Sequence, residues 1–240
     1  HRLAHGNAQL TPFSFSYHFP TSLSEQKALQ LNFDVQPQSL PPTNVHAIIG
    51  RNGVGKTHLL RNLSNTLISP DNSETFGTIE ILDSGVTNSL FANVVSVTFS
   101  AFDPFEPLPE GRVSPEGIRH AYVGLKRNSS GKEDENVDSN DADRPPKSPD
   151  ELQHEFVESV ANCRIGVRSE RWRTALSTLE ADPLFQEAGV QTLSKESYEN
   201  EWREHANNIF RRLSSGHKIV LLTMTRLVEL VDERTLVLLD

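Results

Sequence analysis

The segment from Gly50 to Thr57 constrains this chain more than any other, because it matches the phosphate-binding pattern G-x-x-x-x-G-K-[ST] in full. Gly53 and Gly55 allow backbone conformations that other residues avoid, so successive N–H groups can turn toward phosphate oxygens. Lys56 adds a positive charge for the β- and γ-phosphates, and the Thr57 hydroxyl can ligate Mg²⁺. A helix that starts at this loop favours an anion at its N-terminus.

The residues on either side of the loop fit the same pattern. Residues 45–49 (Val-His-Ala-Ile-Ile) predict a short buried strand that enters the loop. After the loop, leucines at helical spacing predict a helix with one buried face: Leu59, Leu60, Leu63 and Leu67. Strand, glycine-containing loop and helix, in this order, form the context that the phosphate-binding pattern requires.

The last part of the chain carries a second pair of elements. Residues 213–217 (Leu-Ser-Ser-Gly-His) precede a predicted helix over 218–230, whose expected apolar face holds Val220, Met224, Leu227 and Val231. Residues 235–239 then form an apolar strand that ends in Asp240. A carboxylate at the tip of a buried strand can bind Mg²⁺ through water, as a Walker B element does.

With these residues the sequence resembles the ABC-type ATPases. The spacing GxNGxGK[ST] is their variant of the loop, and residues 213–217 are similar to their LSGGQ signature, with Ser215 in place of Gly and His217 in place of Gln. Within that superfamily the resemblance is to the soluble branch. This branch includes the recombination and chromosome-maintenance ATPases, the overcoming-lysogenisation-defect nucleases, and ATPases of anti-phage systems such as Septu and retron-linked effectors.

The resemblance implies a fold and a set of site residues. The fold is α/β, a P-loop NTPase core of the ABC type with an N-terminal antiparallel β subdomain and an inserted helical lobe. The phosphates of ATP would be bound by Asn52, Gly53, Val54, Gly55, Lys56, Thr57 and the amide of His58. Thr57 and Asp240 would hold Mg²⁺, and Lys56 and Asp240 would act in catalysis. In the family a catalytic Glu directly follows the Walker B Asp, so we expect it beyond Asp240, in a longer protein.

The resemblance also implies a dimer. Ser214 and Gly216 would reach the γ-phosphate of ATP bound to a second subunit, so that two ATP molecules are sandwiched in a head-to-tail homodimer.

The formal net charge of −9 argues against a wholly basic nucleic-acid-binding surface. Cys163 is the only cysteine, so no intrachain disulfide can form and a reducing cytoplasm is expected. No apolar run has the length of a membrane span.

Four regions are expected along the chain. Residues 1–126 hold a β subdomain, with alternating strands at 13–19 and 29–35, and the first half of the core. Strands at 76–82 and 93–99 follow, the second central because it is nearly continuous in apolar residues. Residues 127–149 predict an acidic flexible insertion. Residues 150–212 predict a helical lobe that starts with a capping box at Ser148. Residues 213–240 hold the signature helix and the Walker B strand.

Several residues have two interpretations. Tyr17 and Phe33 either stack on adenine or, as we favour, pack in the core. The resembled family has a Q-loop Gln after its central strand, and this chain has none there. Ser100 and Asp103 are the nearest polar residues that could take its place. The alternative is that these residues are an ordinary exit from the strand. Four basic residues flank Trp172: Arg164, Arg168, Arg171 and Arg173. They either bind a nucleic-acid backbone or, as we favour, form solvated helix faces.

These observations predict an ATPase head that handles or senses nucleic acid, in anti-phage defence or DNA repair, beside a nuclease effector subunit. That last step rests on the resemblance alone. Two alternatives stay open, the nucleotide-binding subunit of a membrane transporter and a non-hydrolytic, ATP-gated scaffold. The missing Gln, the acidic insertion and the long helical lobe count against the transporter.

Overall fold

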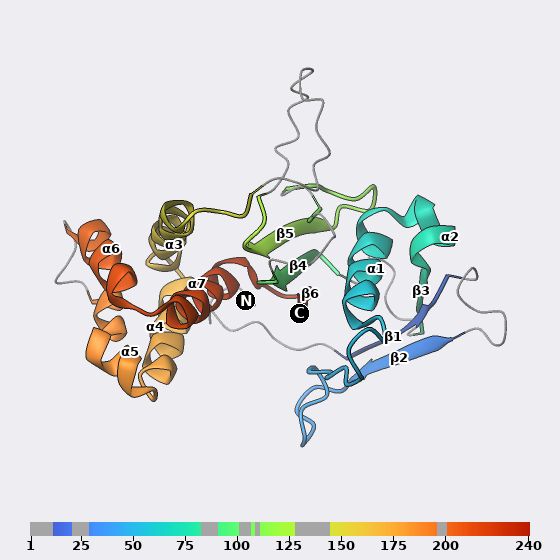
Figure 1. The fold of residues 1–240 in the computed structure, drawn as a ribbon. Coiled ribbons are helices and arrows are strands. Elements are labelled where there is room, and N and C mark those ends of the chain that lie inside the picture. Colours follow the sequence, from blue (N-terminus) through green and yellow to red (C-terminus); the bar gives the residue numbers. More distant parts are fainter. Residues whose placement is uncertain are drawn as a thin grey trace. The chain divides into compact units, whose positions relative to one another are not determined.

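A computed structural model describes residues 12–20, 29–82, 91–100, 107–108, 111–127, 145–195 and 201–240 (Figure 1). The chain divides into two compact units. The first, which we call the sheet unit, holds the described part of Gln9–Arg144 together with Asp232–Asp240. The second, the helical unit, is Pro145–Val231. The architecture is mixed α/β, with one antiparallel and one parallel three-stranded sheet.

The antiparallel sheet confirms the two strands predicted near the start of the chain. Strand β1 (Phe13–His18) lies between β2 (Gln30–Val35) and β3 (Thr78–Ile81), and it pairs antiparallel with both. Phe15 and Tyr17 point into the core from β1. The Tyr17 hydroxyl donates to the carbonyl of Phe76 at 2.6 Å, and burial raises the pKa of this phenol. Tyr17 is therefore a core residue, the role we favoured for it.

Helix α1 (Lys56–Ile68) begins inside the glycine loop, as the leucine spacing predicts. Leu59, Leu63 and Leu67 are buried and Leu60 is partly buried, so the expected apolar face is confirmed. The short helices η3 (Pro70–Asn72) and α2 (Ser73–Phe76) then lead back to β3. The leucine face of α1 packs in one cluster with Phe15, Tyr17 and Val94.

The parallel sheet joins parts of the chain that are far apart in the sequence. Strand β4 (Asn93–Thr98) lies between β5 (Arg119–Gly124) and β6 (Thr235–Leu239), which confirms the prediction that it is central. In the register of β4 with β6, Val97 lies opposite Leu239. The N–H of Asp240 continues this ladder by donating to the carbonyl of Val97 at 3.0 Å.

The strand predicted at residues 45–49 is not present. These residues have no regular secondary structure, and Val45 and Ile49 are 76% and 93% exposed. A strand needs a hydrogen-bonded neighbour, and no described strand pairs with this segment. Of the strand, loop and helix that we expected around the phosphate-binding pattern, only the loop and the helix are therefore present.

The helical unit contains five α-helices and one 3₁₀ helix within the described residues: α3 (Pro149–Cys163), α4 (Arg168–Leu179), α5 (Pro183–Ala188), η5 (Val190–Ser194), α6 (Trp202–Arg212) and α7 (Ser215–Leu230). The capping box predicted at Ser148 is present, because Ser148 and Glu151 bond reciprocally to each other's backbone N–H. Phe156, Trp172 and Leu176 lie in one apolar core. Cys163 is also in this core, and burial raises its thiol pKa to about 12.

The buried face of α7 differs from the predicted one. Leu221, Leu222, Thr225 and Arg226 are buried, whereas Val220 is 45% exposed. Polar contacts with α3 and α4 explain this orientation. The Trp172 indole N–H donates to the Thr225 hydroxyl at 3.4 Å, and the Cys163 thiol donates to the Thr225 carbonyl at 3.3 Å. A periodicity that counts only apolar residues misses a helix face that is anchored by a threonine and an arginine.

One boundary along the chain lies at a different residue from the one that we expected. We grouped residues 213–240 as one region, but α7 packs with α3 and α4 in the helical unit and β6 belongs to the sheet unit. The division falls between Val231 and Asp232. Most of the acidic stretch predicted as a flexible insertion (residues 128–144) lies outside the described residues.

Gly77 permits a close approach between β1 and the end of α2. Its φ is +91°, and a Cβ there would overlap the carbonyl oxygen of His18 and lie 3.0 Å from the Tyr17 ring. We expect Gly77→Ala to lower the local free energy of unfolding by about 2–4 kcal/mol, from backbone strain and overpacking. Gly117→Ala is the matched control, since φ is +85° but its Cβ would meet nothing within 4 Å. Amide hydrogen exchange of β1 measures both, and equal losses would contradict the steric argument.

Candidate functional site

The glycine loop has the backbone conformation that its sequence predicts. Gly53 and Gly55 have φ of +81° and +98°, and the space where a Cβ would stand is open at both positions. Gly55 is the residue before the first turn of α1. Asn52, Val54 and His58 are exposed at the same loop. The loop therefore presents backbone N–H groups and a helix N-terminus to solvent, where an anion can approach.

The side chain of Lys56 lies against its own loop. Its ammonium donates to the carbonyl oxygens of Gly50 at 3.0 Å and Arg51 at 3.1 Å. Both hydrogen bonds are exposed to solvent, so replacing these carbonyls by phosphate oxygens requires little desolvation. The lysine is thus at the loop, with a charge that can be redirected to an anion bound there.

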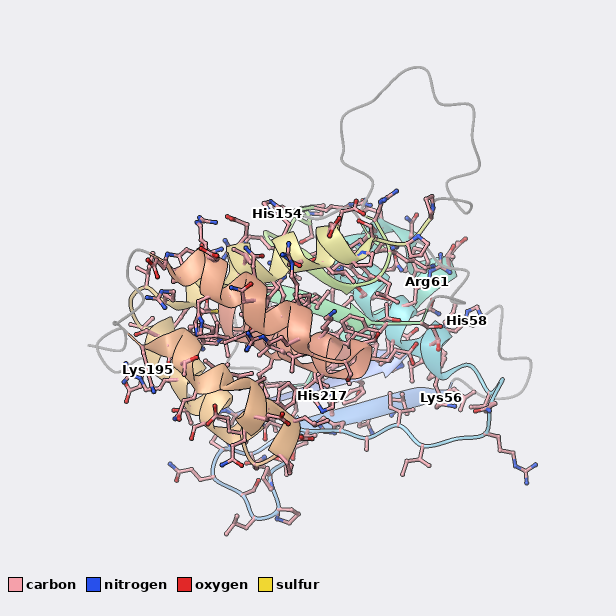
Figure 2. All side chains as sticks on the ribbon, turned by 60° about the vertical axis from the view of Figure 1, so that its left-hand side comes forward. Lys56, His58, Arg61, His154, Lys195 and His217 are labelled. Carbon is pink, nitrogen blue, oxygen red and sulfur yellow. The ribbon has the colours of Figure 1, made fainter. Side chains whose placement is uncertain are left out.

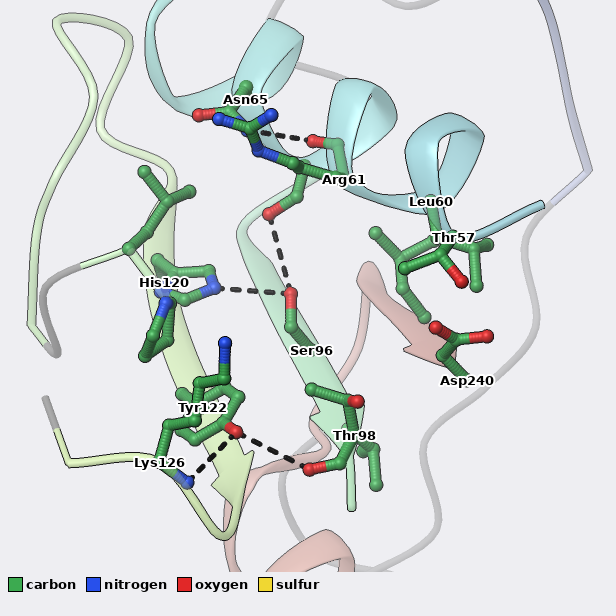
Figure 3. A pocket seen from close by; sticks show the side chains of 15 residues that line it. Thr57, Leu60, Arg61, Asn65, Ser96, Thr98, His120, Tyr122, Lys126 and Asp240 are labelled. Atoms are coloured by element: carbon green, nitrogen blue, oxygen red, sulfur yellow. Dashed lines mark hydrogen bonds between the residues drawn. The ribbon is translucent and has the colours of Figure 1, made fainter. Parts of the chain in front are cut away.

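Thr57 and Asp240 line one pocket of the sheet unit. They come from the start of α1 and from the residue after β6, and Figure 3 shows the hydroxyl of Thr57 and the carboxylate of Asp240 turned toward each other. A hydroxyl and a carboxylate are hard oxygen ligands of the kind that Mg²⁺ prefers. Among the described residues no group of three or more His, Cys, Asp or Glu side chains could hold a metal ion. A metal held by Thr57 and Asp240 alone would keep several water ligands.

The same pocket has a polar wall that our sequence analysis missed. His120 Nε2 lies 3.2 Å from the Ser96 hydroxyl, which lies 3.4 Å from that of Ser64 (Figure 3). The Tyr122 hydroxyl donates to the carbonyl of Thr98 at 3.3 Å. The available signal was the alternation of Ser96 and Thr98 with valines in β4, which places two polar residues on one face of a central strand.

Near the end of β4, Thr98 lines the pocket and Ser100 does not. The Thr98 side chain lines the pocket, and its hydroxyl oxygen is buried with no hydrogen-bond partner among the described residues. Ser100 is exposed and is not among the lining residues, and Asp103 lies outside the described residues. Because the N–H of Asp240 bonds to the carbonyl of Val97, the ends of β4 and β6 bring Thr98 and Asp240 to the same pocket. A strand register is needed to see this, and the sequence does not show it.

Phe33 packs in the core as we favoured, but Arg164 and Arg171 form part-buried hydrogen bonds instead of the solvated helix faces that we favoured for them. Phe33 is partly buried and stacks on Phe15, with ring centroids 4.6 Å apart. Trp172 is 1% exposed and lies in the helical core, so it does not form an aromatic surface for nucleic acid. Arg171 donates to the carbonyl of Val228, in the last turn of α7, and to that of Val231, just after the helix. Arg164 donates to the carbonyl of Leu193 at 2.6 Å, and Arg173 is exposed.

The signature residues lie at the start of α7 in the helical unit. Ser214 is the N-cap, and its hydroxyl oxygen accepts from the backbone N–H of His217. Gly216 lies in the first turn of the helix, and nothing stands within 4 Å of the position that a Cβ would take. The signature thus has the geometry of an open helix N-terminus. Its capping role is internal to the helix and does not by itself identify a ligand.

Comparison with known proteins identifies one relative. The chain is 33% identical over 260 aligned residues to protein ea59 of Escherichia phage lambda. The alignment takes in 100% of this chain and 46% of the relative, so the chain spans about half the length of that protein. No protein-family profile matches the chain. No solved structure matches it either. Within the described residues, no helix combines the length and the apolar character needed to cross a membrane.

The N-cap at Ser214 predicts a stability effect. Ser214→Ala should lower the free energy of unfolding of the helical unit by about 1 kcal/mol, because the first turn of α7 loses a side-chain acceptor. Ser214→Asp should keep most of that stability, since aspartate is an equally good N-cap. Trp172 and Trp202 are the only tryptophans and both lie in this unit, so a urea titration followed by their fluorescence reports it. Equal stability of wild type and Ser214→Ala would refute the capping role.

Proposed function

We propose that this chain is the ATP-binding head of a soluble ABC-type ATPase that forms a homodimer on ATP and hydrolyses it to ADP and phosphate. The observation that carries the proposal is the meeting of two distant sequence elements in one pocket. Thr57 ends the phosphate-binding pattern, and Asp240 ends the strand that we interpret as Walker B. A glycine-rich turn that matched the pattern by accident would have no reason to face such a carboxylate.

The geometry supports a separate role for each of these residues. The N–H groups around Gly53 and Gly55 would bind the β- and γ-phosphates, and the Lys56 ammonium would leave its loop carbonyls to add a positive charge. Thr57 and Asp240 would hold Mg²⁺, which when bound neutralises charge that develops on the phosphates. The buried Thr98 hydroxyl would bind water beside Asp240. Phosphoryl transfer needs mainly such positioning and charge neutralisation, which this set of residues can supply.

The second half of the proposed site is the signature of another subunit. Ser214 and Gly216 would contact the γ-phosphate of ATP bound to the partner, and binding of two nucleotides would close the dimer. The exposed N-terminus of α7 supports this role, because a helix N-terminus carries a partial positive charge that favours an anion. A nucleic-acid-directed role in the cytoplasm, in defence or DNA repair with a nuclease partner, completes the proposal and rests on the family resemblance.

Removal of the lysine tests nucleotide binding. We expect Lys56→Ala to weaken Mg-ATP binding about 100-fold, because several charge-assisted hydrogen bonds to phosphate are lost together. The fold should survive, since the ammonium contacts only exposed loop carbonyls. Arg51→Ala is the matched control: it removes an equal charge from an exposed position of the same loop and should change the affinity by less than about threefold. Titration calorimetry decides, and unchanged affinity in folded Lys56→Ala would refute the loop's assignment.

Substitution of the signature serine tests the dimer. Ser214→Asp keeps the helix cap but places a negative charge where the partner's γ-phosphate would lie. We expect it to bind ATP as wild type does and to lose nucleotide-dependent assembly. Sedimentation of the full-length protein with a slowly hydrolysed ATP analogue measures this. If Ser214→Asp assembles as well as wild type, the signature is only a helix cap and the ABC assignment is wrong.

A further inference from the structure

The pocket that Thr57 and Asp240 line extends beyond this pair, between α1 and the strands β4 and β5 of the sheet unit (Figure 3). About 70 Å³ of it is open to water, which is room for several water molecules or one small ion. Five polar residues from these three elements form its inner wall: Ser64 of α1, Ser96 and Thr98 of β4, and His120 and Tyr122 of β5. All of them belong to the sheet unit.

This inner wall is polar although it lies between a helix and a sheet. Helix α1 packs its buried leucines in the apolar cluster of the sheet unit, and Ser64 and Asn65 line the pocket. The Ser96 hydroxyl lies 3.4 Å from that of Ser64 and 3.2 Å from Nε2 of His120. The hydroxyl oxygen of Thr98 is buried and has no hydrogen-bond partner among the described residues. Such a group costs free energy, which a hydrogen-bonding ligand in the pocket would recover.

The two ends of the pocket carry opposite charges. Asp240 stands at one end, beside Thr57. Lys126 stands at the other end, and Figure 3 shows its ammonium pointing past Tyr122 toward Ser96. The Tyr122 hydroxyl accepts from the backbone N–H of Lys126 at 3.3 Å, which holds this lysine beside the end of β5. An anion in the pocket would therefore be repelled by the carboxylate and attracted by the ammonium.

Lys126 is distinct from the other cations near the pocket. Figure 2 shows Lys56 at the glycine loop and Arg61 further along α1. The ammonium of Lys56 is bonded to carbonyls of its own loop. Arg61 lines the pocket, but its guanidinium carbon lies 6.0 Å from the centroid of the Phe76 ring, outside the pocket lining. An anion that entered between α1 and the sheet would thus meet the positive charge of Lys126.

The hydroxyls, the charge and the size of the pocket fit a phosphate ion. Phosphate oxygens accept hydrogen bonds from hydroxyls, and they form stronger ones with an ammonium. In the proposed reaction the oxygen of water bonds to the γ-phosphorus, and the bond from that phosphorus to the bridging oxygen breaks. ADP and a phosphate ion result. The ion is formed at the Thr57 and Asp240 end of the pocket, and Lys126 lies at the opposite end.

We propose that this pocket takes up the phosphate ion cleaved from ATP, and that the Lys126 ammonium binds it together with the hydroxyls of Ser96 and Thr98. The inference rests on the proposed function, because ATP hydrolysis supplies the ion. It goes beyond that function in two respects. It adds a second phosphate site, separate from the glycine loop, and it assigns a role to a lysine that lies outside every motif of the sequence.

Phosphorus NMR of inorganic phosphate tests this site, with full-length protein saturated by Mg²⁺ and a slowly hydrolysed ATP analogue. The analogue fills the γ-phosphate position, so inorganic phosphate has to bind elsewhere. We expect wild type to bind it, and Lys126→Gln to bind it about tenfold more weakly, because a charge-assisted hydrogen bond is lost. Lys126→Arg keeps the charge and should keep most of the affinity. Arg112→Gln, which removes an exposed charge outside the pocket lining, should bind phosphate as wild type does.

Product inhibition of ATP hydrolysis gives a second measurement. Bound phosphate occupies the place that the next phosphate ion needs, so added inorganic phosphate should slow hydrolysis in wild type without competing with ATP. We expect Lys126→Gln to require about ten times more phosphate for the same inhibition, with its affinity for the ATP analogue unchanged. Inhibition that is purely competitive with ATP would place the phosphate in the glycine loop and overturn the inference.

The outcomes separate this inference from the proposed function. If wild type does not bind the analogue, or if Lys56→Ala binds it as wild type does, the proposed function fails and the inference fails with it. If the analogue binds as proposed, the inference alone is overturned by either of two results. One is that inorganic phosphate does not bind beside the analogue, and the other is that Lys126→Gln and Arg112→Gln bind it equally. Binding that Lys126→Gln loses and Lys126→Arg keeps supports the inference.

Discussion

The hydrogen-bonded ladder between β4 and β6 is the contact on which the candidate site depends. It joins two strands that are far apart in the sequence. The Asn93 side chain of β4, for example, donates to the Thr235 hydroxyl of β6, which is 142 positions away. Without this ladder Asp240 would have no fixed place relative to the glycine loop. With it, the carboxylate stands at the end of a buried parallel sheet, where ligands of open α/β sheets commonly bind. The proposed metal ligands, Thr57 and Asp240, are brought together by backbone pairing and by the packing of α1 on the sheet.

Local features of the fold could be predicted from the sequence, because they depend on neighbouring residues. The leucine face of α1, the capping box at Ser148 and the alternating strands β1 and β2 each follow from spacing within a few positions. The segment at 45–49 was predicted wrongly, since a strand depends on a partner that spacing does not reveal. The buried face of α7 was also missed, because Thr225 anchors it through bonds to Trp172 and Cys163.

The same distinction applies to the candidate site. The glycine loop is a local motif, and its left-handed glycines are present where the pattern requires them. Thr98 and the contact between Ser96 and His120 depend on register and packing between elements, so no motif indicates them. The two halves of the proposed site also belong to different compact units. The phosphate loop and Asp240 lie in the sheet unit, and Ser214 lies in the helical unit.

The insertion of the helical unit between β5 and β6 has a consequence for biosynthesis. All of Pro145–Val231 leaves the ribosome before β6 has been made, and these helices pack with one another in their own unit. The helical unit can therefore be folded while the edge of β4 that β6 will occupy is still unpaired. That edge presents unpaired backbone N–H and C=O groups for the time needed to synthesise the intervening helices, a state in which strands associate with wrong partners. The late arrival of one short strand thus makes translation speed and chaperone access relevant to how much active protein a cell obtains.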